Sequence, residues 1–378
     1  MDSIDSWLIL HHTPSVGPVT FARVLDHFGS PQTVLDSSRA SLRQSGLFKT
    51  AAIDFLSASP DSRSRSIEAD LRWLEQEGAH IVTLGDEAYP ALLREIDDPP
   101  PLLYLRGQVD ALSMPQLAMV GSRNPDTLGR ETANDFARQL ARAGLTITSG
   151  MALGIDTEAH KGALKSGKTV AVTGTGLDRV YPARNRDLAH EIACNGAIIS
   201  EFAIGTEPRP ENFPRRNRVI SGLALGTLVV QSARKSGSLI TARMAMEQGR
   251  EVFAIPGSIH NPLSRGNHLL IRQGAKLVET TEDVVEELGG MLHLLAAQLD
   301  SGPDEPGEEE GPEKAGVGTG DPTMDKVLAV IGYEVVLVDQ VVEFSGLTTE
   351  AVSSIIMRLE IQGLVASLPG GRVQRLQK

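Results

Sequence analysis

Hydrophobic and polar positions alternate regularly from residue 117 onward. Seven apolar runs are separated by amphipathic stretches such as TLGRETANDFARQLARAG. Short buried runs predict parallel strands, and the stretches between them predict crossover helices. The sequence therefore predicts an α/β fold with a doubly wound, mostly parallel, Rossmann-like sheet, in which ligands bind beyond the carboxyl ends of the strands. The runs are LAMVG, LTITSG, TVAVTG, AIISE, TLVVQ, EVFAIPG and KLVE.

Other patterns flank this middle domain, which we place at residues 81–295. Residues 1–80 predict a small helical module, and TPSVGPVTFARVLDHFG predicts a helix-hairpin-helix or SAM-like turn, which either contacts a phosphate or serves packing alone. Residues 296–322 predict an acidic disordered linker, because residues 301–322 hold six Gly, four Pro and seven acids. Residues 323–378 predict a winged-helix domain. The start of its second helix, TTE, favours a protein contact over duplex DNA.

The distribution of charge changes what the net charge suggests. The chain carries −12 in total, but residues 120–275 hold 20 Lys and Arg against 13 Asp and Glu, which leaves +7 there and −19 elsewhere. A basic middle domain in an acidic chain indicates an anion-binding surface. The single cysteine excludes multi-cysteine metal sites, and we expect no metal and no cofactor. Without a signal peptide or membrane span in its first residues, we expect a cytoplasmic protein and no membrane partner.

One phosphate-binding motif is present in the wrong context. GALKSGKT, residues 162–169, matches the P-loop pattern letter for letter. A P-loop follows a strand and opens a helix, so that the loop amides and the helix dipole face the phosphates. Here a helical stretch comes first and a strand follows. We therefore interpret the segment as a helix-to-strand turn and Lys168 as a solvated charge.

Glycines and basic residues instead gather where the predicted strands end. Turns rich in glycine expose backbone amides to anions, and several of them at one rim form a phosphate-binding floor. Four arginines within residues 209–218 (RPENFPRRNR) match phosphate with planar forks of donors, and the phenylalanine among them can stack on a base or be buried. The residues chosen on these grounds are Gly121, Arg123, Gly150, Gly154, Gly174, Gly176, Arg209, Phe213, Arg215, Arg216, Arg218, Lys235, Ser236 and Gly237.

Two histidine constellations are weaker. His11 and His12 are adjacent with no third ligand nearby, and we interpret them as a solvated helix end. Asp156 and His160 lie four residues apart on one helix face. They form either an acid–base pair or, as we favour, only a carboxylate near a helix N-terminus and a helical hydrogen bond.

Six segments in this order and spacing resemble the DNA-processing protein A family (DprA/Smf). They are GSR at 121–123, SGMALGIDTEAHKGAL at 149–164, GTGLDRVYP at 174–182, FPRRNRVISGL at 213–223, KSGSLITA at 235–242 and IPGS at 255–258. The resemblance implies a homodimer that binds single-stranded DNA, helps to load the RecA recombinase during natural transformation or DNA repair, and is not an enzyme.

The resemblance also implies roles for particular residues. Ser122 joins the first phosphate loop, Asn217 belongs to the FPxRNR element, and Ser238 completes the KSGS loop. Arg215 occupies the variable position of FPxRNR. Relatives carry a charge just after the YP of GTGLDRVYP, whereas this chain has Ala183 followed by Arg184, so Arg184 is the candidate for that contact.

Two further points stay open at this stage. The alternative function is a nucleotide-metabolising enzyme of the nucleoside monophosphate hydrolase type. Such enzymes are recognised by a PGGxGT loop, whereas this chain has Pro256-Gly257-Ser258 without a partner acid. For the dimer, an apolar stretch beside a predicted edge strand offers Leu270, Ile271 and Leu277, which form either an interface or ordinary core.

Overall fold

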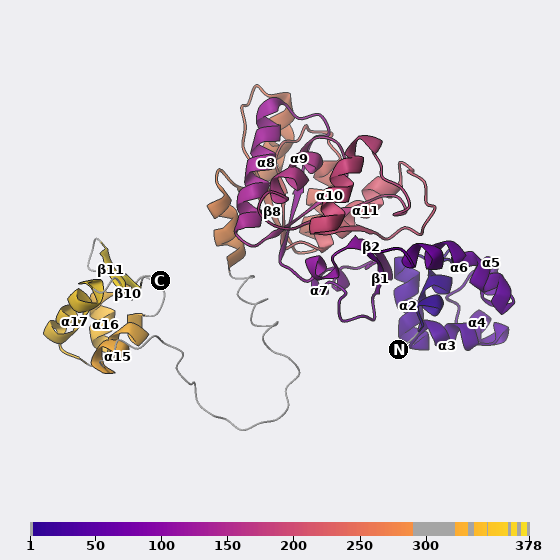
Figure 1. Ribbon diagram of the computed structural model, residues 1–378, viewed down its shortest axis with the longest axis horizontal. Coiled ribbons are helices and arrows are strands. Elements are labelled where there is room, and N and C mark those ends of the chain that lie inside the picture. The colour runs from indigo at the N-terminus through magenta and orange to yellow at the C-terminus, as the bar shows by residue number, and fades with distance from the viewer. Residues whose placement is uncertain are drawn as a thin grey trace. The chain divides into compact units, whose positions relative to one another are not determined.

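The computed structural model describes residues 3–289, 322–331, 336–345, 347–361, 364–368 and 372–375 (Figure 1). They form two compact units, divided between residues 302 and 303. The predicted linker, residues 296–322, lies outside the described residues except for its last position. Within the described ranges, no helix is long and apolar enough to cross a membrane.

A nine-stranded sheet organises the described part of the first unit, in the order β1-β2-β6-β5-β4-β3-β7-β8-β9. The seven predicted strands are confirmed, and they pair in parallel from β6 to β9. Strands β1 and β2 pair antiparallel at the other edge and were not predicted. The strands are β1 Ala79–Thr83, β2 Leu102–Gly107, β3 Gln116–Val120, β4 Thr146–Gly150, β5 Thr169–Val172, β6 Ala197–Ser200, β7 Gly226–Val229, β8 Glu251–Ala254 and β9 Lys276–Leu277.

Helices cover both faces of the sheet because its central strands alternate between two cores. Leu117 and Met119 of β3 pack with α8 and α9, whereas Ala118 and Val120 share the opposite core with α11, α12 and α13. Continuous burial along β3 to β7 is the pattern of a parallel sheet covered on both sides. The bounds are α7 Ala91–Arg94, η1 Val109–Leu112, α8 Thr127–Arg142, α9 Ile155–Ala163, η2 Ala183–Asn185, α10 Arg186–Asn195, α11 Asn212–Gly222, α12 Ser238–Glu247, η3 Pro262–Ser264 and α13 Arg265–Arg272.

The winding of the sheet reverses at β3, which lies between β4 and β7. The connections after β3 and β7 therefore leave in opposite directions, which opens a crevice at the carboxyl ends of these two strands. The loops that follow them meet there, since the Ser122 amide donates to the Gln231 carbonyl at 2.7 Å. The fold thus places the predicted glycine loops where a doubly wound sheet binds its ligands.

The N-terminal helices share a core with the antiparallel edge of the sheet. Trp7, Phe21 and Trp73 pack with Tyr104 of β2. His12 is not the solvated residue that we predicted, because its Nε2 lies 2.8 Å from the buried carboxylate of Asp70. The helices are α1 Ile4–His11, α2 Pro18–Phe28, α3 Pro31–Asp36, α4 Arg39–Gln44, α5 Thr50–Leu56 and α6 Pro60–Leu74.

The second unit has the predicted winged-helix pattern, with a three-stranded sheet in the order β10-β12-β11 among its described residues. Its own core includes Val327, Leu328, Val352 and Leu359. The elements are α15 Pro322–Ile331, β10 Val336–Leu337, α16 Val338–Ser345, α17 Thr349–Ile361, β11 Val365–Leu368 and β12 Arg372–Arg375.

Candidate nucleic-acid interface

Close backbone packing requires glycine in the first two loops of the predicted rim. A Cβ atom at Gly121 would lie 2.5 Å from Cγ1 of Ile155, the first residue of α9. Gly154 has φ +89° and lies against the carbonyls of Ser122 and Arg123, which a side chain would overlap. The Ile155 amide donates to the Ser122 carbonyl at 3.1 Å. The loop after β3 and the start of α9 are therefore fixed to each other by backbone contacts.

Arg216 of α11 lies buried at the carboxyl end of β4, with only 5% of its surface exposed. Its guanidinium occupies the space next to Gly150 that any side chain would need. Among the described residues, its Nε and Nη1 have no hydrogen-bond partner. Burial, opposed by Asp156 and reinforced by Arg123, lowers the pKa of Arg216 to about 10, so the group remains charged at neutral pH. A buried cation with unused donors is a ready partner for an anion.

A cavity of about 280 Å³ opens beside this cation. We call it the Arg216 pocket. Phe213 forms part of its wall. A Cβ atom added at Gly174 would lie 3.1 Å from Cδ1 of the Phe213 ring, so the glycine packs closely against that ring. The Arg123 guanidinium lies 5.9 Å from the centroid of the same ring. The pocket thus combines two cations with an aromatic face. It is lined by Arg123, Asn124, Met151, Ala152, Leu153, Thr173, Gly174, Tyr181, Pro182, Phe213 and Arg216.

Arg218, two residues further along α11, has a different environment. Its Nη2 donates to Oε2 of Glu201 at 2.8 Å, and its Nε lies 2.8 Å from Oδ2 of Asp98. The half-exposed Arg215 shares the same Glu201 oxygen at 3.0 Å. Burial raises the pKa of Glu201, and the two arginines oppose that shift. The fold therefore already neutralises Arg218, and a phosphate contact by Arg218 finds no support in this geometry.

The other predicted basic residues lie outside the Arg216 pocket. Arg209, Arg184 and Lys235 are exposed, and none of the three lines the pocket. The KSGS loop opens α12 and is organised by serine hydroxyls, since Ser236 Oγ lies 2.7 Å from Ser238 Oγ, which donates to Ser232. A Cβ at Gly237 would meet open space, so no close contact requires glycine there. Asn217 is half-buried, and Gly176 packs against Ala203 and Asp178 in the next loop.

The chain is similar to known proteins along most of its length. The family model described as DNA recombination-mediator protein A matches residues 80–289, the DprA-like N-terminal HHH domain matches residues 2–52, and the DprA winged helix domain matches residues 310–371. Protein Smf of Escherichia coli is 41% identical over 377 residues, which covers 99% of this chain and 96% of that protein. The chain belongs to the DNA recombination-mediator protein A family.

Two solved structures of family members are similar to the chain. DNA processing protein A from Streptococcus pneumoniae matches with a TM-score of 0.67 and 36% identity, covering 76% of this chain and 99% of that one. The protein from Helicobacter pylori, whose structure describes a single-stranded DNA binding mode, matches with a TM-score of 0.51 and 30% identity, covering 56% of this chain and 97% of that one.

Sequence reasoning missed two residues of this region, Tyr181 beside the Arg216 pocket and Glu201 beside Arg218. Tyr181 is 48% exposed and its ring centroid lies 5.6 Å from that of Phe213, so the pocket has a second aromatic wall. Only its place in the glycine-rich segment GTGLDRVYP could have indicated this role. Glu201 was missed because its partners come from α11, and nothing in the local sequence predicts that pairing.

Asp156 and His160 do not form an acid–base pair. His160 is fully buried, with Nε2 2.7 Å from the Gly150 carbonyl and Nδ1 2.7 Å from Oγ1 of Thr169. Burial lowers the pKa of His160 to about 4. Asp156 accepts from the Ala152 amide at 3.3 Å, and burial raises its pKa against the opposing charge of Arg216. His160 thus holds the backbone of Gly150, on which Arg216 rests.

Two other predictions turn on local geometry. Residues 162–169 run from the end of α9 to the start of β5, which confirms the helix-to-strand turn, but Lys168 is ion-paired to Asp110 rather than freely solvated. At the sheet edge, Leu270 is 3% exposed and belongs to the core, Ile271 is half-buried against that core, and Leu277 on β9 is 45% exposed. Among the described residues, no three His, Cys, Asp or Glu side chains are grouped to hold a metal.

Proposed function

We propose that this protein binds single-stranded DNA, with a phosphate held between Arg216 and Arg123 and a base placed against Phe213 and Tyr181. The observation that carries the proposal is the buried Arg216 guanidinium, whose Nε and Nη1 lack partners among the described residues beside a cavity of about 280 Å³. Aromatic faces accept any base, and arginine forks hold phosphate without reading sequence. The related Helicobacter pylori protein, described with single-stranded DNA, supports the same ligand.

We propose further that the protein acts by binding rather than catalysis, as a homodimer in the cytoplasm, and helps to load the RecA recombinase onto the strand during natural transformation or DNA repair. Its membership of a family of recombination mediators supports this role. Because Leu270 is part of the core, the dimer proposal now depends on the more accessible Ile271 and Leu277. Light scattering of Ile271→Glu tests it, and an unchanged dimer would remove this edge from consideration.

Salt-dependent binding tests the DNA proposal. Each phosphate contact to a single strand contributes roughly −0.7 to the slope of log affinity against log salt. Arg123→Ala and Arg216→Gln should each reduce the slope by about 0.7, with little dependence on base sequence, because both contacts are to the backbone. Anisotropy of a labelled oligonucleotide measures both quantities. Thermal melting first establishes that each variant folds.

A matched control is Arg142→Ala, since Arg142 ends α8 near the amino end of β4, opposite the carboxyl ends that carry the pocket, and is exposed. It should leave the slope unchanged. If the folded Arg123 and Arg216 variants also keep the parental slope, the strand does not cross this pocket. The same preparations, incubated with nucleoside monophosphates, should release no nucleobase, and release abolished by Arg216→Gln would favour the hydrolase instead.

A further inference from the structure

A second and larger cavity, of about 730 Å³, adjoins the Arg216 pocket. It lies between α6 of the N-terminal module and α10, over strands β2 and β6, which contribute Arg106 and Ile198 to its lining. We call it the α6–α10 groove. The groove and the Arg216 pocket share Met151, Thr173 and Tyr181 as lining residues. The two spaces therefore adjoin each other along these side chains, and the ring of Tyr181 is exposed there.

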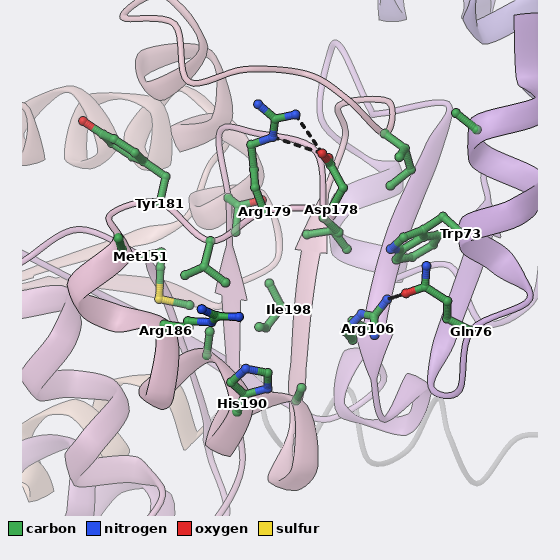
Figure 2. A pocket seen from close by; sticks show the side chains of 18 of the residues that line it. Trp73, Gln76, Arg106, Met151, Asp178, Arg179, Tyr181, Arg186, His190 and Ile198 are labelled. Atoms are coloured by element: carbon green, nitrogen blue, oxygen red, sulfur yellow. Dashed lines mark hydrogen bonds and ion pairs between the residues drawn. The ribbon is translucent and has the colours of Figure 1, made fainter.

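Arginines from four segments line this groove. Arg72 comes from α6, Arg106 from β2, Arg179 from the loop before η2, and Arg186 from the first turn of α10. Asp178 is the single acid among the lining residues, and Arg179 already binds it at 2.8 Å. Figure 2 shows Arg186 and His190 on one side, with Arg106 and Trp73 on the other. Opposite walls thus present positive charge to the space between them.

The floor of the groove is apolar, and part of its wall is incompletely bonded. Ile198 of β6 lies between the two basic sides in Figure 2. The Arg106 guanidinium lies 5.4 Å from the Trp73 ring centroid and donates to Gln76 at 2.5 Å. Trp73 is 2% exposed, and among the described residues neither its indole nitrogen nor Nε of Arg106 has a hydrogen-bond partner. Buried donors without partners are uncommon in a finished core.

We propose that the α6–α10 groove is a second subsite for the DNA strand, which passes from the Arg216 pocket over Tyr181 and continues toward α6. This inference rests on the proposed function. Basic walls suit the phosphates that flank a base, and an apolar floor suits the base itself. Continuity with the Arg216 pocket distinguishes a strand from a separate small anion, because one polymer occupies both spaces. The N-terminal module then takes part in DNA binding through α6 rather than through its hairpin.

Strand length separates this subsite from the first one. An oligothymidine of about four nucleotides fits within the Arg216 pocket and its rim, whereas one of about twelve reaches the groove. Arg186→Glu should lower the affinity for the longer strand about tenfold and reduce its salt slope, while the affinity for the shorter strand is unchanged. The substitution places an acid in the first turn of α10, where the helix dipole favours it, so we expect the variant to fold, which thermal melting checks.

Arg142→Glu is the charge-matched control, at the end of α8 and outside the lining of the groove, and should alter neither affinity. Equal losses for both strand lengths, or none for either, would overturn the groove as a subsite while leaving the proposed function intact. Failure of the parent protein to bind either strand would instead contradict the proposed function.

Photocrosslinking locates the strand directly. A twelve-nucleotide strand carrying 5-iododeoxyuridine at successive positions should crosslink to the peptide that contains His190, which lines the groove and not the Arg216 pocket, and Arg186→Glu should weaken that crosslink. Crosslinks confined to the peptide with Phe213 would contradict the proposal. Polyglutamate tests whether the groove binds an acidic peptide rather than DNA. If it displaces the longer strand from the parent protein but not from Arg186→Glu, the groove binds acidic peptides instead.

Discussion

Helix α11 carries two arginines, Arg216 and Arg218, that are equally buried, each with 5% of its surface exposed. Arg218 is held by Glu201 and Asp98, so its charge is satisfied within the fold. Arg216 makes no ion pair among the described residues, and it rests against Gly150 at the edge of a cavity. The two arginines therefore differ in their partners, because Arg218 is ion-paired to Glu201 and Asp98, whereas Arg216 lies beside Gly150 and feels the charge of Asp156 without an ion pair to it.

The difference also separates stability from binding. Removing one member of a buried ion pair leaves its partner charged and desolvated, which costs far more than the pair contributes over an apolar replacement. Arg216 makes no ion pair within the described part of the chain, so its removal relieves the fold of a desolvated charge, takes a favourable charge away from Asp156 and removes the proposed DNA contact. We expect Arg218 to matter chiefly for folding and Arg216 chiefly for binding.

The largest expected effect follows from breaking the Arg218 pair. Arg218→Ala should lower the free energy of unfolding by about 3–5 kcal/mol, because Glu201, which is 2% exposed, loses its buried partner and keeps only the half-exposed Arg215. Urea denaturation measures this. The folded fraction should keep its affinity for single-stranded DNA, and a folded variant that loses binding would mean that Arg218 contacts the strand after all.

A double substitution sharpens that test. Glu201→Gln combined with Arg218→Ala removes the buried carboxylate together with its partner, so the pair should be less destabilised than the sum of the two single variants. Additive losses would show that the two side chains are not energetically coupled, contrary to their 2.8 Å separation.

The role of Arg216 is tested by a substitution at Gly150, against which its guanidinium packs. Gly150→Ala would place a Cβ atom in the space that Nη1 of Arg216 occupies, so the guanidinium must move. We expect DNA affinity to fall by about tenfold or more and stability to fall by about 1–3 kcal/mol, the usual range for overpacking. Gly237→Ala, where the added atom meets open space, is the matched control and should bind as the parent does. Equal binding by all three proteins would contradict the role assigned to Arg216.

The sequence predicted the fold better than it predicted the site. Buried apolar runs predicted the seven parallel strands. The edge strand β1 has no such run and is partly exposed, and β2 was missed because the three prolines before it indicate a loop. The glycine loops were found because strand ends have a local signature. The contrast between Arg216 and Arg218 could not be found locally, because it depends on Asp98 and Glu201, which only folding brings to α11.

Lowering the pH should lower the free energy of unfolding through His160, which holds the backbone of Gly150 beside Arg216. The pKa of His160 in the folded protein is about 4, below its ordinary value of 6.5. Between these values the unfolded chain binds a proton that the folded protein excludes, so stability is full above pH 6.5 and falls as the pH falls toward 4. At pH 5 the loss due to His160 should be about 2 kcal/mol.

Urea denaturation at pH 7 and pH 5 measures that loss in the parent protein and in His160→Gln. The variant is expected to be less stable at pH 7 but to show a smaller decrease between the two values. Part of the decrease should persist, because burial also lowers the pKa of His11 to about 4. The same decrease in both proteins would mean that His160 is protonated as readily in the fold as outside it.

The smallest effect is expected at the residue whose motif is the most explicit. Lys168 completes the P-loop pattern, yet it lies between α9 and β5 and is ion-paired to the largely exposed side chain of Asp110. Surface pairs of this kind contribute about 0–1 kcal/mol. Lys168→Ala should therefore change the free energy of unfolding by less than about 1 kcal/mol and leave the salt slope of DNA binding unchanged, as measured by denaturation and anisotropy.

Nucleoside triphosphate should not raise the melting temperature of either protein, because no helix N-terminus follows this loop to receive the phosphates. A triphosphate-dependent rise that Lys168→Ala abolishes would show that this motif binds phosphate at a helix-to-strand turn, and it would contradict the rule by which the P-loop was rejected.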